Sequence, residues 1–201
     1  PELGEATPIV WFDLFNPERP RKFLGSGMLG TTSAAIYTEK LFATQNQYAQ
    51  ARIVEPWRGR SGIVIMSNDT MTNYLVLEVV AGPFGNDRIR LRTGTAYNAY
   101  SAILDEYVKP SSWSETDVVG VGYDPDTNTF HGYLNGTSVV DWEDTGNVVN
   151  KANRHSGLIF DMDGNLLSIG TGFVDFIGYD RATVPAPTGK AYLLWRDAWS
   201  T

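Results

Sequence analysis

Short runs of β-branched and aromatic residues, each ended by turn-forming residues, follow one another along most of this chain. Glycine, proline, threonine, asparagine and aspartate recur about every eight to twelve residues, which is the spacing typical of antiparallel sandwiches and barrels. No long stretch carries apolar residues at the helical period. The sequence therefore predicts an all-β fold built from two antiparallel sheets.

One strand is predicted with particular clarity at residues 87–93, where Ile89 and Leu91 alternate with three arginines. Successive side chains of a strand point to opposite faces, so this strand is expected to have one apolar face and one wet face. Three other segments are apolar at nearly every position and are expected to be central strands of the core. They are residues 62–66, 74–80 and 117–123.

Consecutive hairpins are predicted over residues 117–142. Asn135-Gly136 is the residue pair that a two-residue type I′ turn favours, and the Asp-Pro-Asp-Thr-Asn sequence at 124–128 is typical of a turn. Two later segments, residues 156–160 and 172–179, are expected to supply further strands of the same fold.

The two ends of the chain differ from its middle. Prolines interrupt both ends, and proline limits continuous strand pairing. We therefore expect an N-terminal arm at residues 1–30 that leads into the first strand, a β-sandwich at 31–180 and a C-terminal arm at 181–201. Trp195 and Trp199 in the C-terminal arm are expected to pack against the core or against a neighbouring subunit.

Charge and composition exclude several classes of function. The chain has 16 basic and 23 acidic residues, and its net charge of −7 argues against nucleic acid as a partner. The absence of cysteine excludes disulfides, thiolate metal sites and cysteine nucleophiles. No stretch approaches the ~18 apolar residues of a transmembrane helix, so we expect no membrane insertion.

The order of these motifs over residues 11–180 resembles concanavalin A-like lectin/glucanase domains, in the laminin-G-like form found in minor tail proteins of actinobacteriophages. The segments that carry the resemblance are residues 11–16, 47–53, 62–66 with 73–77, 119–121 with 132–136, and 157–160 with 173–176. The resemblance implies a two-sheet jelly roll that lies on a virion. It also implies several copies, other virion proteins as partners, and attachment to host cell-wall glycan.

Residues for catalysis are hard to find. The glucanases of this fold resemble one another in a strand of the form Glu-x-Asp-x-Glu, which sets two carboxylates on either side of a sugar. The nearest segment here has Asp141 and Glu143 on one strand face and lacks the third acid. His131 and His155 are not accompanied by a Gly-x-Ser-x-Gly sequence. We therefore expect a protein that is not an enzyme, with His131 on or near the surface.

Calcium is the one cofactor with a candidate site. Asp124, Asp126 and Asn128 place oxygens at i, i+2 and i+4, as the opening of an EF-hand loop does, and residues 161–165 repeat that spacing. Neither segment continues with the later glycine and glutamate of that loop. Aspartate and asparagine are also what ordinary tight turns need, so both interpretations stay open.

Two groups of residues are candidates for binding a ligand. Arg88, Arg90 and Arg92 share one strand face, where they either bind an anionic cell-wall polymer or pair with acids on neighbouring strands. Trp57 and Trp113 fall in expected loops, where a tryptophan either stacks on a sugar or folds back over the edge of the sheet.

Three functions follow from these observations. The favoured one is a lectin-like virion protein that attaches to host-surface glycan through many weak contacts. The alternative is a purely architectural subunit of a tail or capsid, and a glycoside hydrolase is the least favoured.

Overall fold

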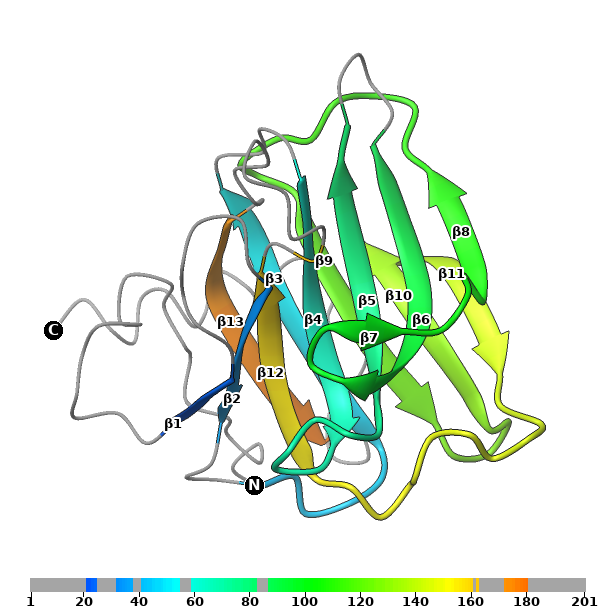
Figure 1. The fold of residues 1–201 in the computed structure, drawn as a ribbon. Coiled ribbons are helices and arrows are strands. Elements are labelled where there is room, and N and C mark those ends of the chain that lie inside the picture. Colours follow the sequence, from blue (N-terminus) through cyan, green and yellow to red (C-terminus); the bar gives the residue numbers. More distant parts are fainter. Residues whose placement is uncertain are drawn as a thin grey trace, which may run out of the picture.

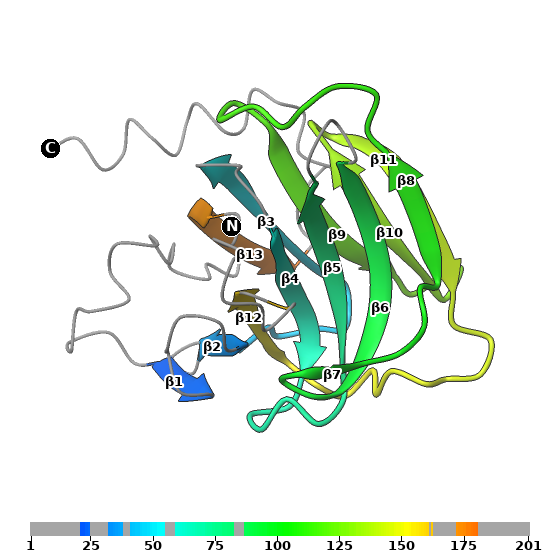
Figure 2. The same cartoon turned by 45° about the horizontal axis from the view of Figure 1, so that its top comes forward.

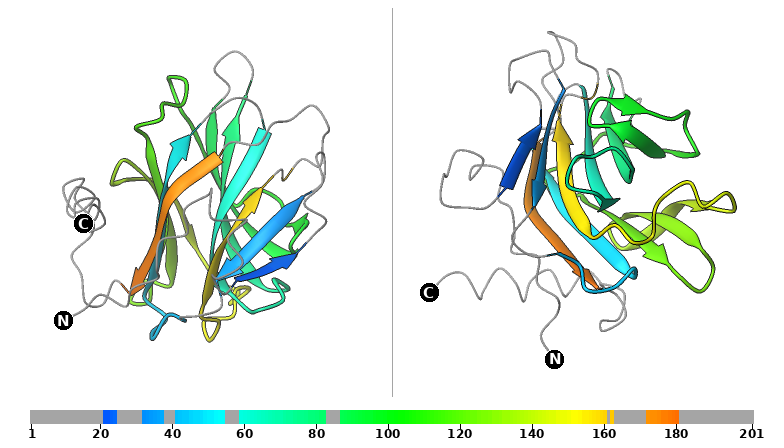
Figure 3. Two further views of the ribbon diagram at one scale, coloured as in Figure 1. Left: turned by 90° about the vertical axis from the view of Figure 1, so that its left-hand side faces the viewer. Right: turned by 60° about the horizontal axis from the view of Figure 1, so that its bottom comes forward.

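The computed structural model describes residues 21–24, 32–37, 41–54, 59–82, 87–160, 162 and 172–180. These residues form two stacked layers of strands, which Figure 1 shows from the front and Figure 3 from the side. Several sequence predictions fall outside the described residues: Trp57, Trp195 and Trp199, the C-terminal arm, and most of the segment 161–165.

The larger sheet has eight strands. Its order is β1 (Arg21–Leu24), β2 (Ser33–Tyr37), β12 (His155–Phe160), β4 (Gly59–Ser67), β5 (Tyr74–Ala81), β6 (Arg88–Ala96) and β7 (Ala99–Tyr100), and β8 (Asp105–Val108) also pairs with β6. Because β1 pairs with β2, part of the expected N-terminal arm belongs to this sheet.

The smaller sheet has five strands, in the order β11 (Thr137–Glu143), β10 (Thr129–Leu134), β9 (Val118–Asp124), β3 (Gln47–Val54) and β13 (Gly172–Asp180). All strand pairs in both sheets are antiparallel. The described residues contain no helix, and so they contain no helix that is long and apolar enough to cross a membrane. The predicted all-β jelly-roll sandwich is confirmed.

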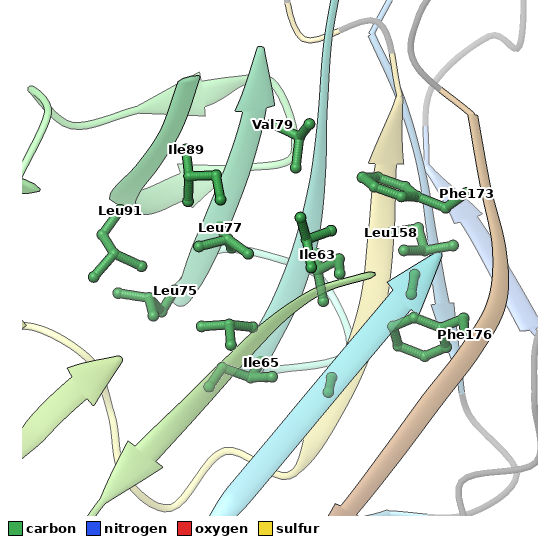
Figure 4. Close-up of a cluster of buried hydrophobic side chains, with 14 of the residues drawn as sticks. Ile63, Ile65, Leu75, Leu77, Val79, Ile89, Leu91, Leu158, Phe173 and Phe176 are labelled. Atoms are coloured by element: carbon green, nitrogen blue, oxygen red, sulfur yellow. The ribbon is translucent and has the colours of Figure 1, made fainter. Parts of the chain in front are cut away.

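The hydrophobic core lies between the two sheets. The larger sheet points a row of branched aliphatic side chains inward, and β13 supplies two phenylalanines from the other side (Figure 4). None of these side chains is exposed to solvent: Ile63, Ile65, Leu75, Leu77, Val79, Ile89, Leu91, Leu158, Phe173 and Phe176. As predicted, Ile89 and Leu91 face the core, while the three arginines of β6 face outward and are partly exposed.

The hairpin of β10 and β11 turns at Asn135 and Gly136, whose φ angles of 50° and 83° are those of the predicted type I′ pair. A β-bulge at Val139 then shifts the register, so that Tyr133 pairs with Ser138 while Gly132 pairs with Val140. The shift directs Val140 and Trp142 inward, and Trp142 stacks on Phe130 with the ring centroids 5.7 Å apart.

Tyr74 belongs to a second cluster of buried apolar side chains, which includes Val64, Val76 and Ile159, and Tyr100 packs against this cluster. Tyr74 Oη donates to the carbonyl oxygen of Ala96 at 2.8 Å, and Tyr100 Oη donates to that of Tyr97 at 2.7 Å. Burial raises the pKa of both phenols well above the usual value, and the nearby Glu78 carboxylate raises the pKa of Tyr100 further. Both side chains are therefore held in the neutral form.

These two tyrosines should make the fold sensitive to alkali. In the unfolded chain they lose their protons near pH ~10, whereas the folded chain keeps them protonated, so the free energy of unfolding falls as the pH rises beyond that value. Each contributes a slope of up to about 1.4 kcal/mol per pH unit. Urea unfolding measured across this alkaline range should show a shallower slope for the double variant Tyr74→Phe/Tyr100→Phe. Equal slopes would contradict the assignment.

Candidate functional site

A group of charged side chains lies on the outer face of the larger sheet, over β4, β5, β6 and β8, and we call it the arginine face. It consists of Arg60 on β4, Glu78 on β5, Arg88, Arg90 and Arg92 on β6, and Glu106 on β8. The strand register sets Glu78 opposite Arg90, and Arg90 opposite Glu106, so that acid, base and acid follow one another across three strands. The β-alternation predicted from the sequence thus brings each arginine next to a carboxylate.

Glu78 is the centre of the arginine face, with only 1% of its side chain exposed. Its Oε1 accepts from Arg60 Nη1 at 3.2 Å, and its Oε2 accepts from Arg92 Nε at 2.9 Å and lies 3.6 Å from Arg90 Nη1. A buried carboxylate is costly unless charges and hydrogen bonds compensate it, and these guanidinium groups do so.

The outer part of the arginine face is held by Glu106. Arg90 Nε donates to Glu106 Oε2 at 2.5 Å, and Arg88 Nη1 donates to Glu106 Oε1 at 3.1 Å. Arg88, Arg90 and Arg92 therefore pair with acids of neighbouring strands, which is the second of the two alternatives. Their binding of an anionic cell-wall polymer stays a prediction.

Trp113 is buried, so its ring is not open to a ligand. Only 6% of the residue is exposed, and its indole Nε1 donates to the carbonyl oxygen of Val80 at 2.8 Å. Its backbone nitrogen donates to Asp87 Oδ2 at 2.7 Å, and Lys109 Nζ lies 5.3 Å from the ring centroid. The tryptophan folds back over the sheet, because there its indole is both buried and hydrogen-bonded.

Two polar side chains of the turn at 124–128, those of Asp124 and Asn128, make hydrogen bonds within the protein. Asp124 Oδ1 accepts from the backbone nitrogen of Asp126 at 3.0 Å, and Asn128 Oδ1 accepts from Tyr123 Oη at 2.9 Å. Asn128 also takes a φ of 52° and donates from Nδ2 to the carbonyl oxygen of Asp144. The oxygen of the candidate calcium ligand Asn128 thus accepts from Tyr123, and calcium binding at this turn stays a prediction.

A second polar group lies on the outer face of the smaller sheet, and it brings together His131 and Asp141, which the sequence analysis considered separately. We call it the polar-aromatic patch, and it consists of His131 and Tyr133 on β10 with Ser138 and Asp141 on β11. His131 Nδ1 lies 2.5 Å from Asp141 Oδ1, and Ser138 Oγ donates to the same oxygen at 2.8 Å. The bulge at Val139 is what brings Asp141 opposite His131.

The polar-aromatic patch does not have the geometry of a catalytic triad. In a triad the serine hydroxyl contacts the imidazole nitrogen that the carboxylate leaves open, so that histidine can take its proton. Here Ser138 and His131 both bind one oxygen of Asp141, so the imidazole is not placed to activate the serine. Among the described residues, no three acidic or histidine side chains are grouped as a metal site would require.

The fold defines a lectin-like β-sandwich. No family model and no curated protein matches the chain. Among solved structures, a carbohydrate-binding module from Bacillus subtilis superposes with a TM-score of 0.50 and 15% identity, covering 80% of this chain and 88% of its own. A legume lectin-like domain from Entamoeba histolytica superposes with a TM-score of 0.50 and 10% identity, covering 80% and 84%. These likenesses establish the fold of the chain.

Proposed function

We propose that this chain is a non-enzymatic, lectin-like protein of a bacteriophage virion that attaches to glycan on the host surface. The observation that carries the proposal is the two-sheet fold shared with a carbohydrate-binding module and with a legume lectin-like domain. The order of motifs along the sequence supports a place among the tail proteins, where many copies strengthen weak individual contacts.

The chemistry of the described side chains supports binding rather than hydrolysis. Asp141 and Glu143 both lie on the outer, exposed side of β11, but Asp141 is bound to His131 and Ser138 instead of facing a second catalytic acid. A retaining glycosidase needs two carboxyl groups about 5 Å apart on either side of the sugar bond. The hydrogen bonds of Asp141 to a histidine and a serine of its own hairpin do not supply that second carboxyl group.

The test uses the full chain in multivalent form. Biotinylated protein on streptavidin beads is applied to a glycan array and to cell-wall preparations from actinobacteria, with bovine serum albumin on the same beads as the control. We expect retention on at least one class of glycan, because multivalent display raises the apparent affinity by about 100-fold or more. If neither the array nor the cell walls retain the beads, the proposal fails and the architectural function takes its place.

A further inference from the structure

Two glycines of β9 lie next to the polar-aromatic patch. On β9 the partner of His131 is Gly122 and the partner of Tyr133 is Gly120, so neither ring has a side chain next to it on that strand. A Cβ added at Gly120 would lie 2.3 Å from Tyr48 Oη, which shows that the Tyr48 ring lies over this glycine. Both glycines are buried, and at Gly120 the absence of a side chain makes room for the Tyr48 ring.

Three aromatic rings lie close together on the outer face of the smaller sheet, next to these glycines. Tyr48 and Tyr133 meet edge to face with their centroids 5.5 Å apart, and the His131 and Tyr133 centroids are 6.2 Å apart. His131 and Tyr133 are partly exposed, whereas Tyr48 is buried. Aromatic side chains offer apolar contact area at little cost in conformational entropy, which suits packing against the C–H groups of a sugar ring.

Asp141 is fixed before any ligand arrives. Its Oδ1 holds His131 and Ser138, and its backbone nitrogen donates to Asp105 Oδ2 at 2.8 Å. No described residue donates a hydrogen bond to Oδ2, and 57% of the side chain is exposed. A carboxylate oxygen held in place in this way can accept hydrogen bonds from sugar hydroxyls without a further loss of side-chain freedom.

The acidic side chains at the patch favour a neutral sugar over an anionic one. Asp141 and Glu143 both face outward from β11, and the charged side chains of the arginine face lie on the outer face of the other sheet. An anionic sugar would meet like charge here, whereas a neutral sugar would not.

We propose that the polar-aromatic patch binds one ring of a neutral pyranose. The ring packs against Tyr133 and His131, and its hydroxyl groups donate to Oδ2 of Asp141. This assignment rests on the proposed function, since it names the site and the sugar class for the same glycan attachment.

The first test is a titration of the ¹⁵N-labelled full chain, followed by NMR. The probes are the methyl pyranosides of glucose, galactose, mannose and N-acetylglucosamine, with methyl glucuronide as the anionic counterpart. We expect the amide signals of Gly120, Gly122 and residues 131–141 to shift with at least one neutral pyranoside, and to shift less with the glucuronide.

The second test compares variants on the glycan that the wild type binds best on the array. Asp141→Asn should weaken binding by about 10- to 100-fold, since it removes a charged hydrogen-bond acceptor. His131→Gln should weaken it by about 5-fold. Glu143→Gln is the matched control, because it removes a carboxylate from the same face of the same strand, and it should leave binding unchanged. Thermal unfolding of each variant shows whether it is folded.

The outcomes separate the two proposals. If folded Asp141→Asn and His131→Gln bind as well as the wild type, the site assignment is overturned while glycan attachment stands. If Arg88→Gln loses binding while the two patch variants keep it, the glycan binds at the arginine face, and the site assignment is overturned as well. If the wild type binds no glycan on the array or in cell walls, the proposed function itself fails.

Discussion

Replacing Glu78 with glutamine is expected to lower the free energy of unfolding by about 3 kcal/mol. The carboxylate is buried on the outer face of the larger sheet, where it pairs with Arg60, Arg90 and Arg92. Glutamine keeps the shape but removes the charge, so the guanidinium groups repel one another over a neutral side chain. Urea unfolding followed by tryptophan fluorescence measures the loss.

Glu106→Gln is the matched control for this change. Glu106 also pairs with two arginines of the same face, but 30% of its side chain is exposed, and exposed ion pairs contribute only ~0–1 kcal/mol. The difference between the two variants therefore isolates the effect of burial. Equal losses of stability would show that Glu78 is not the centre of the arginine face.

A methyl group at position 157 is expected to be as damaging, with Gly157→Ala lowering the free energy of unfolding by about 3 kcal/mol. Gly157 lies on β12, where it pairs with Ile36 on one side and with Val64 on the other. An added Cβ would lie 2.3 Å from the carbonyl oxygen of Ala35. Since that oxygen belongs to the backbone, β2 and β12 must move apart to relieve the clash.

Gly146→Ala provides the comparison. A Cβ at position 146 would lie 3.4 Å from Val148 Cγ2, which is ordinary contact distance, so the midpoint of thermal unfolding should change little. If Gly157→Ala unfolds at the same temperature as Gly146→Ala, the tight approach of β2 to β12 is not a constraint on the fold.

Features that depend on neighbouring residues in the sequence could be predicted. Alternation places Ile89 and Leu91 in the core whatever lies opposite them, and Asn135-Gly136 carries its own backbone preference. The pairing of the β6 arginines with acids was one of two alternatives. The sequence could not decide between them, because Glu78 and Glu106 reach β6 only through the order of strands in the sheet.

Trp113 and Asp141 show why the remainder could not be predicted. The hydrogen-bond partners of Trp113, Asp87 and Val80, lie 26 and 33 residues earlier in the chain. A hairpin with no bulge would set Asp141 opposite Phe130 and turn it toward the core. The additional residue at Val139 exchanges the inward and outward positions of the following residues of β11. No local pattern in the sequence predicts this bulge.

The hydrogen bond from the Asp141 backbone to Asp105 joins the edge strand of one sheet to the edge strand of the other, where β11 and β8 run side by side (Figure 2). β8 also carries Glu106 into the salt bridges on the far side of the sandwich. A pull applied at Asp141 would therefore reach both layers together, and the sandwich would resist shear between its sheets along this edge.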